Sequence, residues 1–419
     1  MRRILIGRSI GPGGEFDHDS LRRILKSPAI NSGNNLWFQG LISTLLIPEN
    51  HVEFLRDDMS VEHINDHFDA VIKPHANIFS TQFVRVLEDH VRTWKGLTIP
   101  MYIVACGAQA DSYDALDELA GSIRTPACRF MDSVYATGGE FALRGYFTKA
   151  LFDRLGYRTA EVTGCPSLYQ CGRDLQITEE KVPREAFRPV VNGRLELVGP
   201  LLQEDGEVPF IDQGDFFRFF YDPAFREEHD LGVRDMVRLI GRHGAFTLRM
   251  MGSDRIKLFR NTPEWRSFLM ENGFSLSFGS RIHGNIMAIL AGIPTVVCAC
   301  DSRTREMAEF HEIPFVPKGV YDMERLYELY ARTDYRAFNR GFGTKYDRYE
   351  DFLIRHGLAE RINQKNAFFT SEKRKTEDRR VNRAFILEMK RKLDRFGSVY
   401  RAIGYALRLK RGLAQILRK

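Results

Sequence analysis

Short apolar runs alternate with helical patterns along the chain up to Thr333. The β-branched apolar runs predict strands, and the segments between them repeat apolar side chains at the three- or four-residue spacing of a helix. Strands that alternate with helices of about 10–15 residues predict parallel sheets joined by crossover helices. The predicted strands are Ile4–Ile6, Phe68–Ile72, Met101–Ala105, Glu161-Val162, Leu195–Val198, Ser275–Phe278 and Pro294–Ala299. The predicted helices are Leu36–Leu46, Thr81–Val91, Thr148–Leu155, Gly284–Ala291 and Met323–Ala331.

Two changes in this pattern suggest domain boundaries. The stretch Gln176–Pro189 is polar, contains two prolines and separates two strand-helix series, and the alternation stops after Thr333. We therefore predict an α/β fold with two Rossmann-like domains, at 1–182 and 183–335, and a helical C-terminal extension at 336–419. Ligands of open α/β sheets bind outside the carboxyl ends of the strands, so the cleft between the two domains is the expected site.

Composition agrees with a folded protein. The chain has 419 residues, of which 43% are hydrophobic and 28% are charged, so it can build two cores and disorder is not expected for most of it. The net charge of +6 suits phosphate or carboxylate ligands, nucleic acid or an anionic membrane, and does not choose among them. Neither a signal peptide nor a membrane-spanning run is evident, and the six scattered cysteines suit a reducing compartment, so we expect a cytoplasmic protein.

The end of the chain is basic and has a helical pattern. Between Arg395 and Lys419 there are seven Lys or Arg residues and no acidic residue, and apolar side chains recur at helical spacing. Such a helix can lie on an anionic membrane surface, where each basic group contributes about 1 kcal/mol. It can equally pack against the protein with its basic face in water. The sequence leaves both readings open.

One segment combines residue types that suit anion chemistry. Ser280-Arg281-Ile282-His283-Gly284-Asn285 follows a predicted strand and opens a predicted helix. A helix N-terminus offers unpaired amides and partial positive charge, an arginine adds a planar fork for phosphate or carboxylate, and a histidine exchanges protons near neutral pH. The alternative is a simple helix cap beside a buried, inert histidine.

Metal chemistry has little support in the sequence. His63 and His67 are four residues apart, a spacing that can chelate a metal from one face of a helix. The His-Glu-x-x-His order of metalloproteases is missing, and no third ligand is evident nearby. We therefore expect a solvated polar stretch there and no metal in the chemistry.

Three blocks of the sequence resemble the polysaccharide pyruvyl transferase family. That family shows Ser-Arg-Leu-His-Gly, an Ala-Gly-Val-Pro turn and an Asp-Pro-Lys-type loop, and this chain has the counterparts Ser280–Gly284, Ala291–Pro294 and Asp301, followed by Glu306–Phe310. The other two blocks run through Leu143–Thr148 to Gly164-Cys165-Pro166-Ser167, and from Phe68–Phe79 to Ile103–Gln109. The blocks keep the family order.

The resemblance implies roles for particular residues. The Arg and His of the family motif are linked to phosphoenolpyruvate binding and catalysis, and they correspond to Arg281 and His283. A donor-contacting Arg upstream corresponds to Arg144. Arg303 stands where the family has a Lys. This is a departure, because the Arg guanidinium is a planar group with several donors, whereas the Lys ammonium is a point charge. The implied substrate-binding set is Arg144, Arg281, Arg303, Gly284 and Asn34.

The N-terminal loop departs further from the family. Members often carry an Asn-x-Gly-Asp sequence near a glycine-rich loop, and the nearest likeness here is Asn31-Ser32-Gly33-Asn34-Asn35, displaced by an insertion with Asp17-His18-Asp19. The resemblance implies that this loop forms part of the acceptor side, in the N-terminal domain, with the donor side in the C-terminal domain. The alternative is that the insertion is a solvated loop.

The implied reaction moves the enolpyruvyl group of phosphoenolpyruvate to a sugar hydroxyl pair, closing a ketal, in polysaccharide or exopolysaccharide biosynthesis. His283 is the expected general acid. Asp301 or Asp17 is the expected base. The expected partners are phosphoenolpyruvate, with no further cofactor, and a sugar or lipid-linked oligosaccharide, at the inner face of the membrane if the tail binds there.

Other functions remain open on the sequence alone. The family fold resembles the two-domain GT-B-like architecture of many nucleotide-sugar glycosyltransferases, so such an activity is the first alternative. A catalytically silent protein of glycan assembly is the second, although Arg144, Arg281 and His283 are all present. Nucleic-acid binding is not expected, because no aromatic-rich sheet motif or known module is evident.

Overall fold

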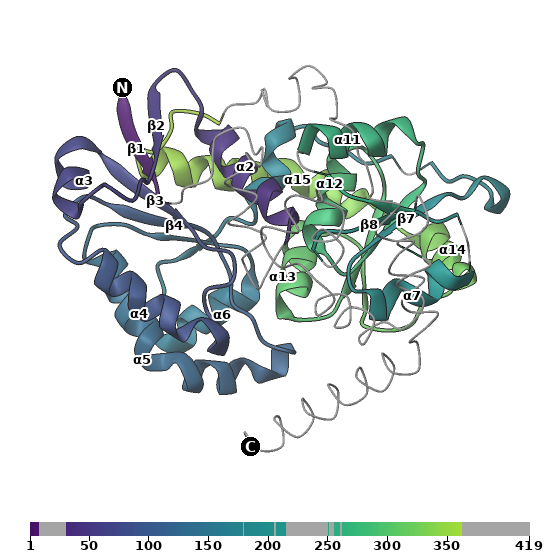
Figure 1. The fold of residues 1–419 in the computed structure, drawn as a ribbon, viewed down its shortest axis with the longest axis horizontal. Helices are drawn as coiled ribbons and strands as arrows, with labels where there is room; N and C mark the ends of the chain where they lie inside the picture. Colours follow the sequence, from purple (N-terminus) through teal and green to yellow (C-terminus); the bar gives the residue numbers. More distant parts are fainter. Residues whose placement is uncertain are drawn as a thin grey trace, which may run out of the picture.

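Two parallel six-stranded sheets, on the left and right of Figure 1, form the centre of the structure. The computed structural model describes residues 1–7, 31–178, 180–204, 207–214, 250, 255–259 and 262–362. The two sheets, with helices packed on them, confirm the predicted fold class. The loop at Asp17 and the basic tail after Arg395 lie outside the described residues, so the proposals for them stay predictions. Within the described part of the chain, no helix is both long and apolar enough to cross a bilayer.

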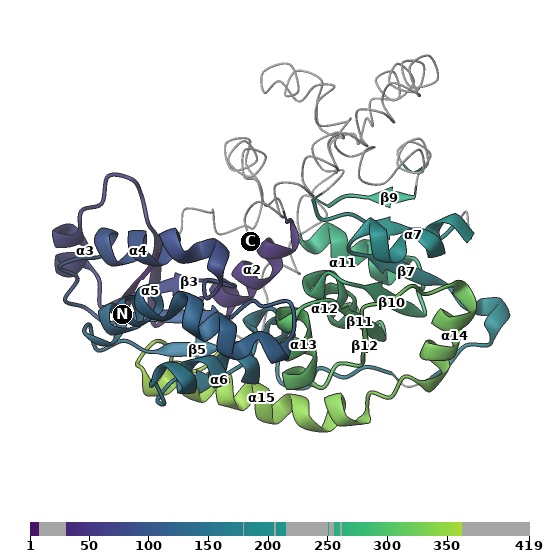
Figure 2. The ribbon, with the colours of Figure 1, turned by 90° about the horizontal axis from the view of Figure 1, so that it is seen from below.

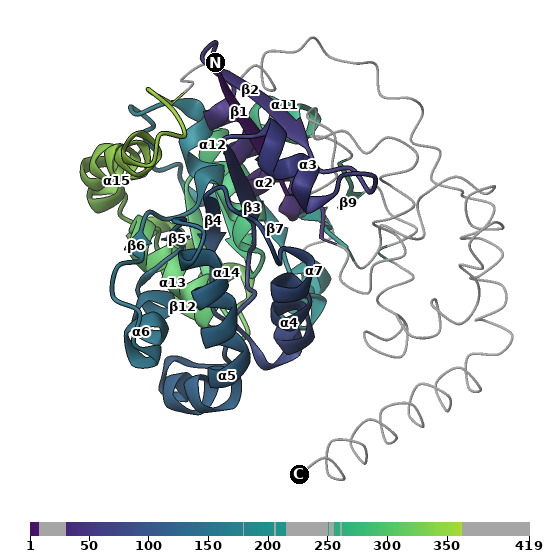
Figure 3. The same cartoon turned by 90° about the vertical axis from the view of Figure 1, so that its left-hand side faces the viewer.

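The N-terminal sheet has the strand order β2-β1-β3-β4-β5-β6. Side chains alternate between its faces, as they do along any strand. Ile4 and Ile6 share a core with helices α2 and α15, whereas Leu5 shares a core with α3 to α6. Figure 3 shows α15 and α4 on opposite sides of this sheet. The strands are β1 (Arg2–Ile6), β2 (Asn50–Phe54), β3 (Ala70–Pro74), β4 (Met101–Cys106), β5 (Phe141–Leu143) and β6 (Glu161–Val162). The helices are α2 (Gly33–Leu45), α3 (Val61–His67), α4 (Val84–Thr93), α5 (Leu116–Tyr135) and α6 (Tyr146–Leu155).

The C-terminal sheet has the strand order β12-β11-β10-β7-β8-β9. Its strands are β7 (Pro189–Asn192), β8 (Phe210–Ile211), β9 (Ile256–Lys257), β10 (Leu276–Gly279), β11 (Thr295–Ala299) and β12 (Phe315–Pro317). Its helices are α7 (Leu195–Glu204), α11 (Thr262–Glu271), α12 (Ile282–Leu290), α13 (Ser302–His311) and α14 (Met323–Arg332). The predicted strand Leu195–Val198 is wrong, because it is the first turn of α7. Four apolar residues are too few to separate a strand from a buried helix.

Each sheet has a topological switch point, where ligands of open α/β sheets bind. In the C-terminal sheet the chain moves from β7 through β8 to β9 and then returns as β10 on the other side of β7. The chain therefore leaves β7 and β10 in opposite directions along the sheet, and the loops after these two strands flank the switch point. In the N-terminal sheet, β1 lies between β2 and β3 in the same way. The loop after β3 thus lies at the second switch point.

The long helix α15 (Arg336–Arg355) packs back on the N-terminal sheet. It runs below both halves of the molecule in Figure 2. Its Tyr349 hydroxyl lies 3.1 Å from the Thr44 hydroxyl of α2, and its Arg355 guanidinium donates to the Glu161 carboxylate of β6 at 2.7 Å. This helix belongs to the predicted C-terminal extension, and the limits predicted for the three domains stay predictions.

Candidate functional site

The loop after β10 is held by the end of β7 at the switch point. Asn192, the last residue of β7, accepts a hydrogen bond from the Arg281 backbone N–H at 3.1 Å and donates to the Asn285 side chain at 2.8 Å. Asn285 in turn donates to the Gly279 carbonyl at 2.8 Å. These buried amides fix where α12 begins, and with it the direction of His283.

A glycine allows the two loops to meet. Gly193 has φ of 110°, and a Cβ there would lie 2.4 Å from the Ser280 hydroxyl oxygen. That backbone conformation and that contact both exclude a larger side chain. The Ser280 oxygen accepts a hydrogen bond from the Arg194 backbone N–H at 3.0 Å. The side chain of Arg194 therefore starts beside the Ser-Arg-Ile-His segment.

His283 is buried in the first turn of α12. Its exposed fraction is 5%, and its Nε2 lies 3.7 Å from the Cys165 sulfur. Burial, and then the positive charges of Arg144 and Arg303, hold the pKa of His283 well below its ordinary value. Both effects favour the neutral imidazole over the imidazolium. The two arginines come from different sheets, because Arg144 follows β5 and Arg303 lies on α13.

Arg144 is a buried cation with unused donors. It is 3% exposed, and burial lowers its pKa. One terminal nitrogen donates to the Asn77 side chain at 3.3 Å, and the guanidinium lies 5.4 Å from the ring centroid of Trp37. Its Nε and other terminal nitrogen have no hydrogen-bond partner among the described residues. A buried charge with unmet donors is costly, and a bound phosphate or carboxylate would satisfy it.

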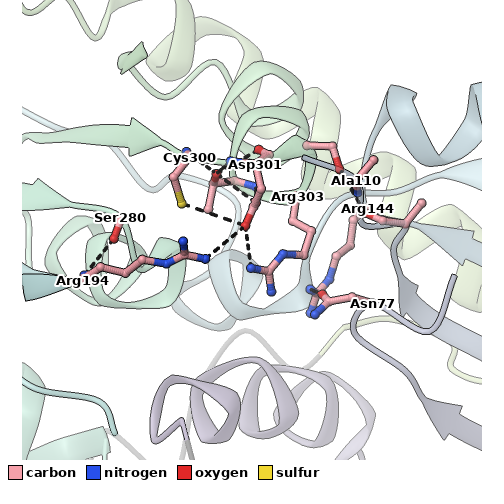
Figure 4. A network of polar contacts seen from close by, with 11 residues as sticks. Asn77, Ala110, Arg144, Arg194, Ser280, Cys300, Asp301 and Arg303 are labelled. Atoms are coloured by element: carbon pink, nitrogen blue, oxygen red, sulfur yellow. Dashed lines mark hydrogen bonds and ion pairs between the residues drawn. The ribbon is translucent and has the colours of Figure 1, made fainter. Parts of the chain in front are cut away.

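A second charged group lies beside Arg144. Figure 4 shows the Arg303 and Arg144 side chains pointing the same way, with Asp301 between Arg303 and Arg194. Asp301 accepts a hydrogen bond from Arg303 at 2.6 Å and lies 4.0 Å from an Arg194 nitrogen. The Arg303 Nε is buried and has no partner among the described residues. Asp301 thus pairs with Arg303 of α13 and lies near Arg194, which follows β7, while Arg144 lies beside Arg303.

Asp301 also caps α13. Its second oxygen accepts from the Thr304 backbone N–H at 3.1 Å. Burial opposes the charge on Asp301, but the charge of Arg303 and the hydrogen bonds from Arg303 and Thr304 outweigh it and lower the pKa. A low pKa with both oxygens engaged favours a positioning role for Asp301. Its predicted role as the base stays a prediction.

Removal of the Asp301 carboxylate is expected to destabilise the protein. Asp301→Ala loses an N-cap and leaves the buried side of Arg303 unpaired, so we expect the free energy of unfolding to fall by about 1–3 kcal/mol. Asp322→Ala is the matched control, because Asp322 caps α14 through the Arg325 N–H at 2.8 Å but is exposed. Denaturant unfolding checks this. Equal losses in the two variants would contradict the role given to Asp301.

Glu306 links α13 to the N-terminal domain. It is 1% exposed and accepts two hydrogen bonds from Thr148 of α6, one from the backbone N–H and one from the hydroxyl, each at 2.9 Å. Ser302 adds a second link, because its hydroxyl accepts from the Ala110 N–H at 2.9 Å. Burial raises the pKa of Glu306 to about 8, against the opposing hydrogen bonds of Thr148 and the charge of Arg144. These contacts fix Arg144 of the N-terminal sheet and Arg303 of α13 relative to each other.

The raised pKa of Glu306 predicts that stability falls as pH rises. Native Glu306 keeps its proton up to about pH 8, whereas an unfolded chain releases it near the ordinary value of 4.5. The native state therefore binds more protons between these values, and the stabilisation present below pH 4.5 is lost by pH 8. Each pKa unit corresponds to about 1.4 kcal/mol, so the effect is on the order of a few kcal/mol.

Denaturant unfolding at several pH values measures this slope. Glu306→Gln keeps the shape and one acceptor oxygen for Thr148, cannot ionise, and is expected to flatten the slope. Glu309→Gln on the same helix is the control, because Glu309 is only half-buried and pairs with Arg305 at 2.7 Å. A slope that Glu306→Gln leaves unchanged would show that Glu306 does not titrate as described.

The other predicted residues lie at the same edge. Arg281 is the N-cap of α12, is half-buried, and its side chain has no ion pair or hydrogen bond within the described residues. The Gly284 amide donates to the Arg281 carbonyl at 2.9 Å, and a Cβ at Gly284 would lie 2.9 Å from the Asn192 side chain. Gly284 is therefore needed for close packing here. Roles of Arg281 and Gly284 in substrate binding stay predictions.

The N-terminus of α2 reaches His283 from the other domain. A Cβ at Gly33 would lie 2.9 Å from the His283 Cβ and 2.3 Å from the Gln213 side-chain oxygen. Asn34 is the next residue, is half-buried, and donates its N–H to the Asn31 carbonyl at 3.0 Å. The predicted loop is thus brought to the site. A direct role of Asn34 in binding stays a prediction.

Several residues of the site have no predicted role. Gln213 is 2% exposed, and neither its oxygen nor its nitrogen has a hydrogen-bond partner among the described residues. Asn192 is the last residue of β7, and Arg194 lies just after it. This strand was not predicted because it is short and begins with Pro189. Polar residues directly after an apolar run would have been the signal. The residues without a predicted role are Asn77, Cys165, Asn192, Arg194, Gln213 and Glu306.

The fold and site define a class of protein. Two doubly wound sheets bring buried and half-buried arginines together at the carboxyl ends of their strands, as in an anion-binding α/β enzyme. The family model of polysaccharide pyruvyl transferases matches residues 89–302, about half of the chain. The chain belongs to the polysaccharide pyruvyl transferase family and is therefore a transferase. The matched segment contains Arg144, Cys165, Arg194, Arg281 and His283, whereas Arg303 and Glu306 follow it.

Several solved structures show a distant resemblance to the chain. A crystal structure of UDP-N-acetylglucosamine 2-epimerase is 12% identical, with a TM-score of 0.37, and covers 86% of this chain and 97% of its own. The UDP complex of MnaA from S. aureus is 10% identical, with a TM-score of 0.39, and covers 86% and 98%. The glycosyltransferase SnogD from Streptomyces nogalater is 12% identical, with a TM-score of 0.33, and covers 84% and 85%. These scores carry no argument about activity. No curated protein matches the chain.

Proposed function

We propose that this protein transfers the enolpyruvyl group of phosphoenolpyruvate to a sugar hydroxyl, and that a second hydroxyl then closes a pyruvyl ketal. The polymer is a bacterial polysaccharide, and the acceptor is a sugar or a lipid-linked oligosaccharide. Family membership gives the transferase class. The arrangement of charges around His283 supports the donor.

The observation that carries this proposal is the state of Arg144. Its side chain is 3% exposed, makes no ion pair within the described residues and has two nitrogens without a partner. The Nε–H and a terminal N–H of a guanidinium lie in one plane and match the two oxygens of a phosphate or carboxylate. An anion of the donor thus has a preorganised position beside His283.

The number of cations suits a donor with two anionic groups. Phosphoenolpyruvate carries a phosphate and a carboxylate on a three-carbon frame. Arg144, Arg303 and Arg194 together bring three positive charges, of which Asp301 balances one. The two remaining charges are available to the donor, and they are already in place when it binds. Arg281, the N-cap residue of α12, can add a further contact to the donor.

His283 is the proposed proton donor. Addition of the sugar hydroxyl requires a proton on the methylene carbon and leaves positive charge on the carbon that bears the phosphate oxygen. The hydroxyl oxygen bonds to that carbon. The phosphate leaves when the second hydroxyl attacks. The positive charges of Arg144 and Arg303 act on the His283 ring. The proposal places the donor that these arginines bind next to that imidazole.

Product analysis tests this function. The purified protein is incubated with phosphoenolpyruvate and a panel of free and lipid-linked sugars, and the products are examined by mass spectrometry and NMR. We expect one sugar class to gain a pyruvyl ketal while inorganic phosphate appears in equal amount. Transfer from a sugar nucleotide, with phosphoenolpyruvate unused, would refute the proposal.

A further inference from the structure

A buried thiol lies behind His283. Cys165 is fully buried, and its sulfur lies 3.7 Å from the His283 Nε2. The Ser167 hydroxyl, also fully buried, donates to the same sulfur at 3.0 Å. Because Ser167 uses the sulfur as an acceptor, the thiol hydrogen is left to point at the imidazole.

We propose that Cys165 acts through His283 as a positioning and proton-relay residue, fixing the ring with its proton on Nδ1 and exchanging a proton with Nε2 during turnover. The tautomer rests on the contacts alone. The relay rests also on the proposed function.

The position of the thiol is set from α13. The Cys165 backbone N–H donates to the His311 Nε2 at 3.1 Å. Gly164, with φ of 80°, brings the backbone so close to His311 that a Cβ there would lie 2.6 Å from the ring. His311 is itself 1% exposed. The sulfur therefore has little freedom to move away from His283.

The two nitrogens of His283 face different groups. Nε2 contacts the thiol, whereas Nδ1 has no hydrogen-bond partner among the described residues. Accepting the S–H at Nε2 requires a lone pair there, so the single proton of the neutral ring is placed on Nδ1. Nδ1–H is then the group that can face a substrate.

The relay explains how a neutral histidine gives up a proton between arginines. An imidazolium would lie near the charges of Arg144 and Arg303, which disfavour it. With the thiol, the Nδ1–H bond breaks as the methylene C–H bond forms, and the S–H bond breaks as an Nε2–H bond forms. The ring stays neutral. The thiolate that remains is stabilised by the charge of Arg144, which acts on Cys165, and by the Ser167 hydroxyl.

The same groups return to their starting state in the next step. The sugar hydroxyl loses its proton as its oxygen bonds to the donor carbon. That proton goes to Nδ1, and the Nε2 proton returns to the sulfur. One proton enters the product methyl group and one leaves the acceptor, so the exchange balances without an oxidant or a reductant. No separate base is needed for this hydroxyl.

Nitrogen NMR tests the tautomer without any substrate. The full-length protein is labelled with ¹⁵N-histidine, and the signals of His283 are identified among the eleven histidines by their loss in His283→Gln. We expect a protonated Nδ1 and an unprotonated Nε2 in the wild type, and a mixture of tautomers in Cys165→Ala. A wild-type proton on Nε2, or an unchanged spectrum in Cys165→Ala, would overturn the proposal.

Kinetics test the relay. Cys165→Ala is expected to lower kcat by at least about 10-fold with little change in KM for phosphoenolpyruvate. Cys165→Ser, which keeps a donor and an acceptor, is expected to recover part of the loss, and Cys171→Ala, a half-buried control nearby, to lose none. A wild-type kcat in Cys165→Ala would rule out the relay. The expected spectra without any turnover of phosphoenolpyruvate would instead refute the proposed function and leave the tautomer standing.

Discussion

Replacement of Arg144 by methionine is expected to lower kcat/KM for phosphoenolpyruvate by about 10³-fold. The loss of one preorganised donor to a developing or bound anion costs about 10²–10³-fold in comparable sites. Arg144 offers two unused nitrogens and lies in a buried place where water cannot replace it. Initial-rate kinetics with phosphoenolpyruvate varied at saturating acceptor measure the effect.

The same change is not expected to weaken the fold. Arg144 is a desolvated cation without an ion pair among the described residues, and replacing such a charge by an apolar side chain of similar length is often neutral or stabilising. Thermal unfolding should therefore give an equal or higher Tm. Arg129→Met, at an exposed position of α5, is the matched control and should change neither quantity. Normal turnover by Arg144→Met would remove Arg144 from the donor site.

Replacement of His283 by asparagine is expected to lower kcat by about 10²–10⁴-fold, the range of a lost general acid. KM for phosphoenolpyruvate should change less, because the arginines that hold the donor remain. Asparagine fits the first turn of a helix and keeps a polar group there. Steady-state kinetics separate the two parameters, and single-turnover measurements show whether the chemical step is the one that slows.

A buried histidine away from the site provides the control. His90 is 5% exposed, and neither of its ring nitrogens has a hydrogen-bond partner among the described residues. Burial, with the charge of Lys73, lowers its pKa to about 3. His90→Asn tests what the loss of a buried ring does to stability, and its kcat should stay normal. A similar fall of kcat in both variants would mean that His283 contributes to packing rather than to proton transfer.

Long apolar runs made much of the fold predictable. Met101–Ala105 and Pro294–Ala299 are buried on both faces, so their sequences are continuously apolar and read as central strands. The short strands β7 and β8 were not predicted, because two to four residues carry no periodicity. Leu195–Val198 was predicted as a strand instead, although these residues form the first turn of α7.

The site was predictable where a motif follows a strand. The Ser-Arg-Ile-His segment could be placed at a strand-to-helix turn, and the family resemblance added Arg144 and Arg303. Contacts between distant segments could not be predicted in this way. Glu306 and Thr148 are 158 positions apart, and His283 and Cys165 are 118 apart. Only the packing of the two domains brings such pairs together.

The structure also changes the meaning of Asp301. Its residue type and position made it a candidate base, because a carboxylate near a catalytic histidine can accept a proton. Its contacts with Arg303 and Thr304 instead lower its pKa and fix the start of α13. Whether an aspartate acts as a base depends on these neighbours, and the sequence does not show them.

Release of phosphate from phosphoenolpyruvate, with and without sugar acceptors, tests the central claim most directly. Wild type, Arg144→Met and Arg129→Met are measured side by side. The account predicts acceptor-dependent release by wild type and Arg129→Met, and almost none by Arg144→Met. Failure of the wild type to release phosphate with any acceptor, or release that Arg144→Met retains in full, would contradict it.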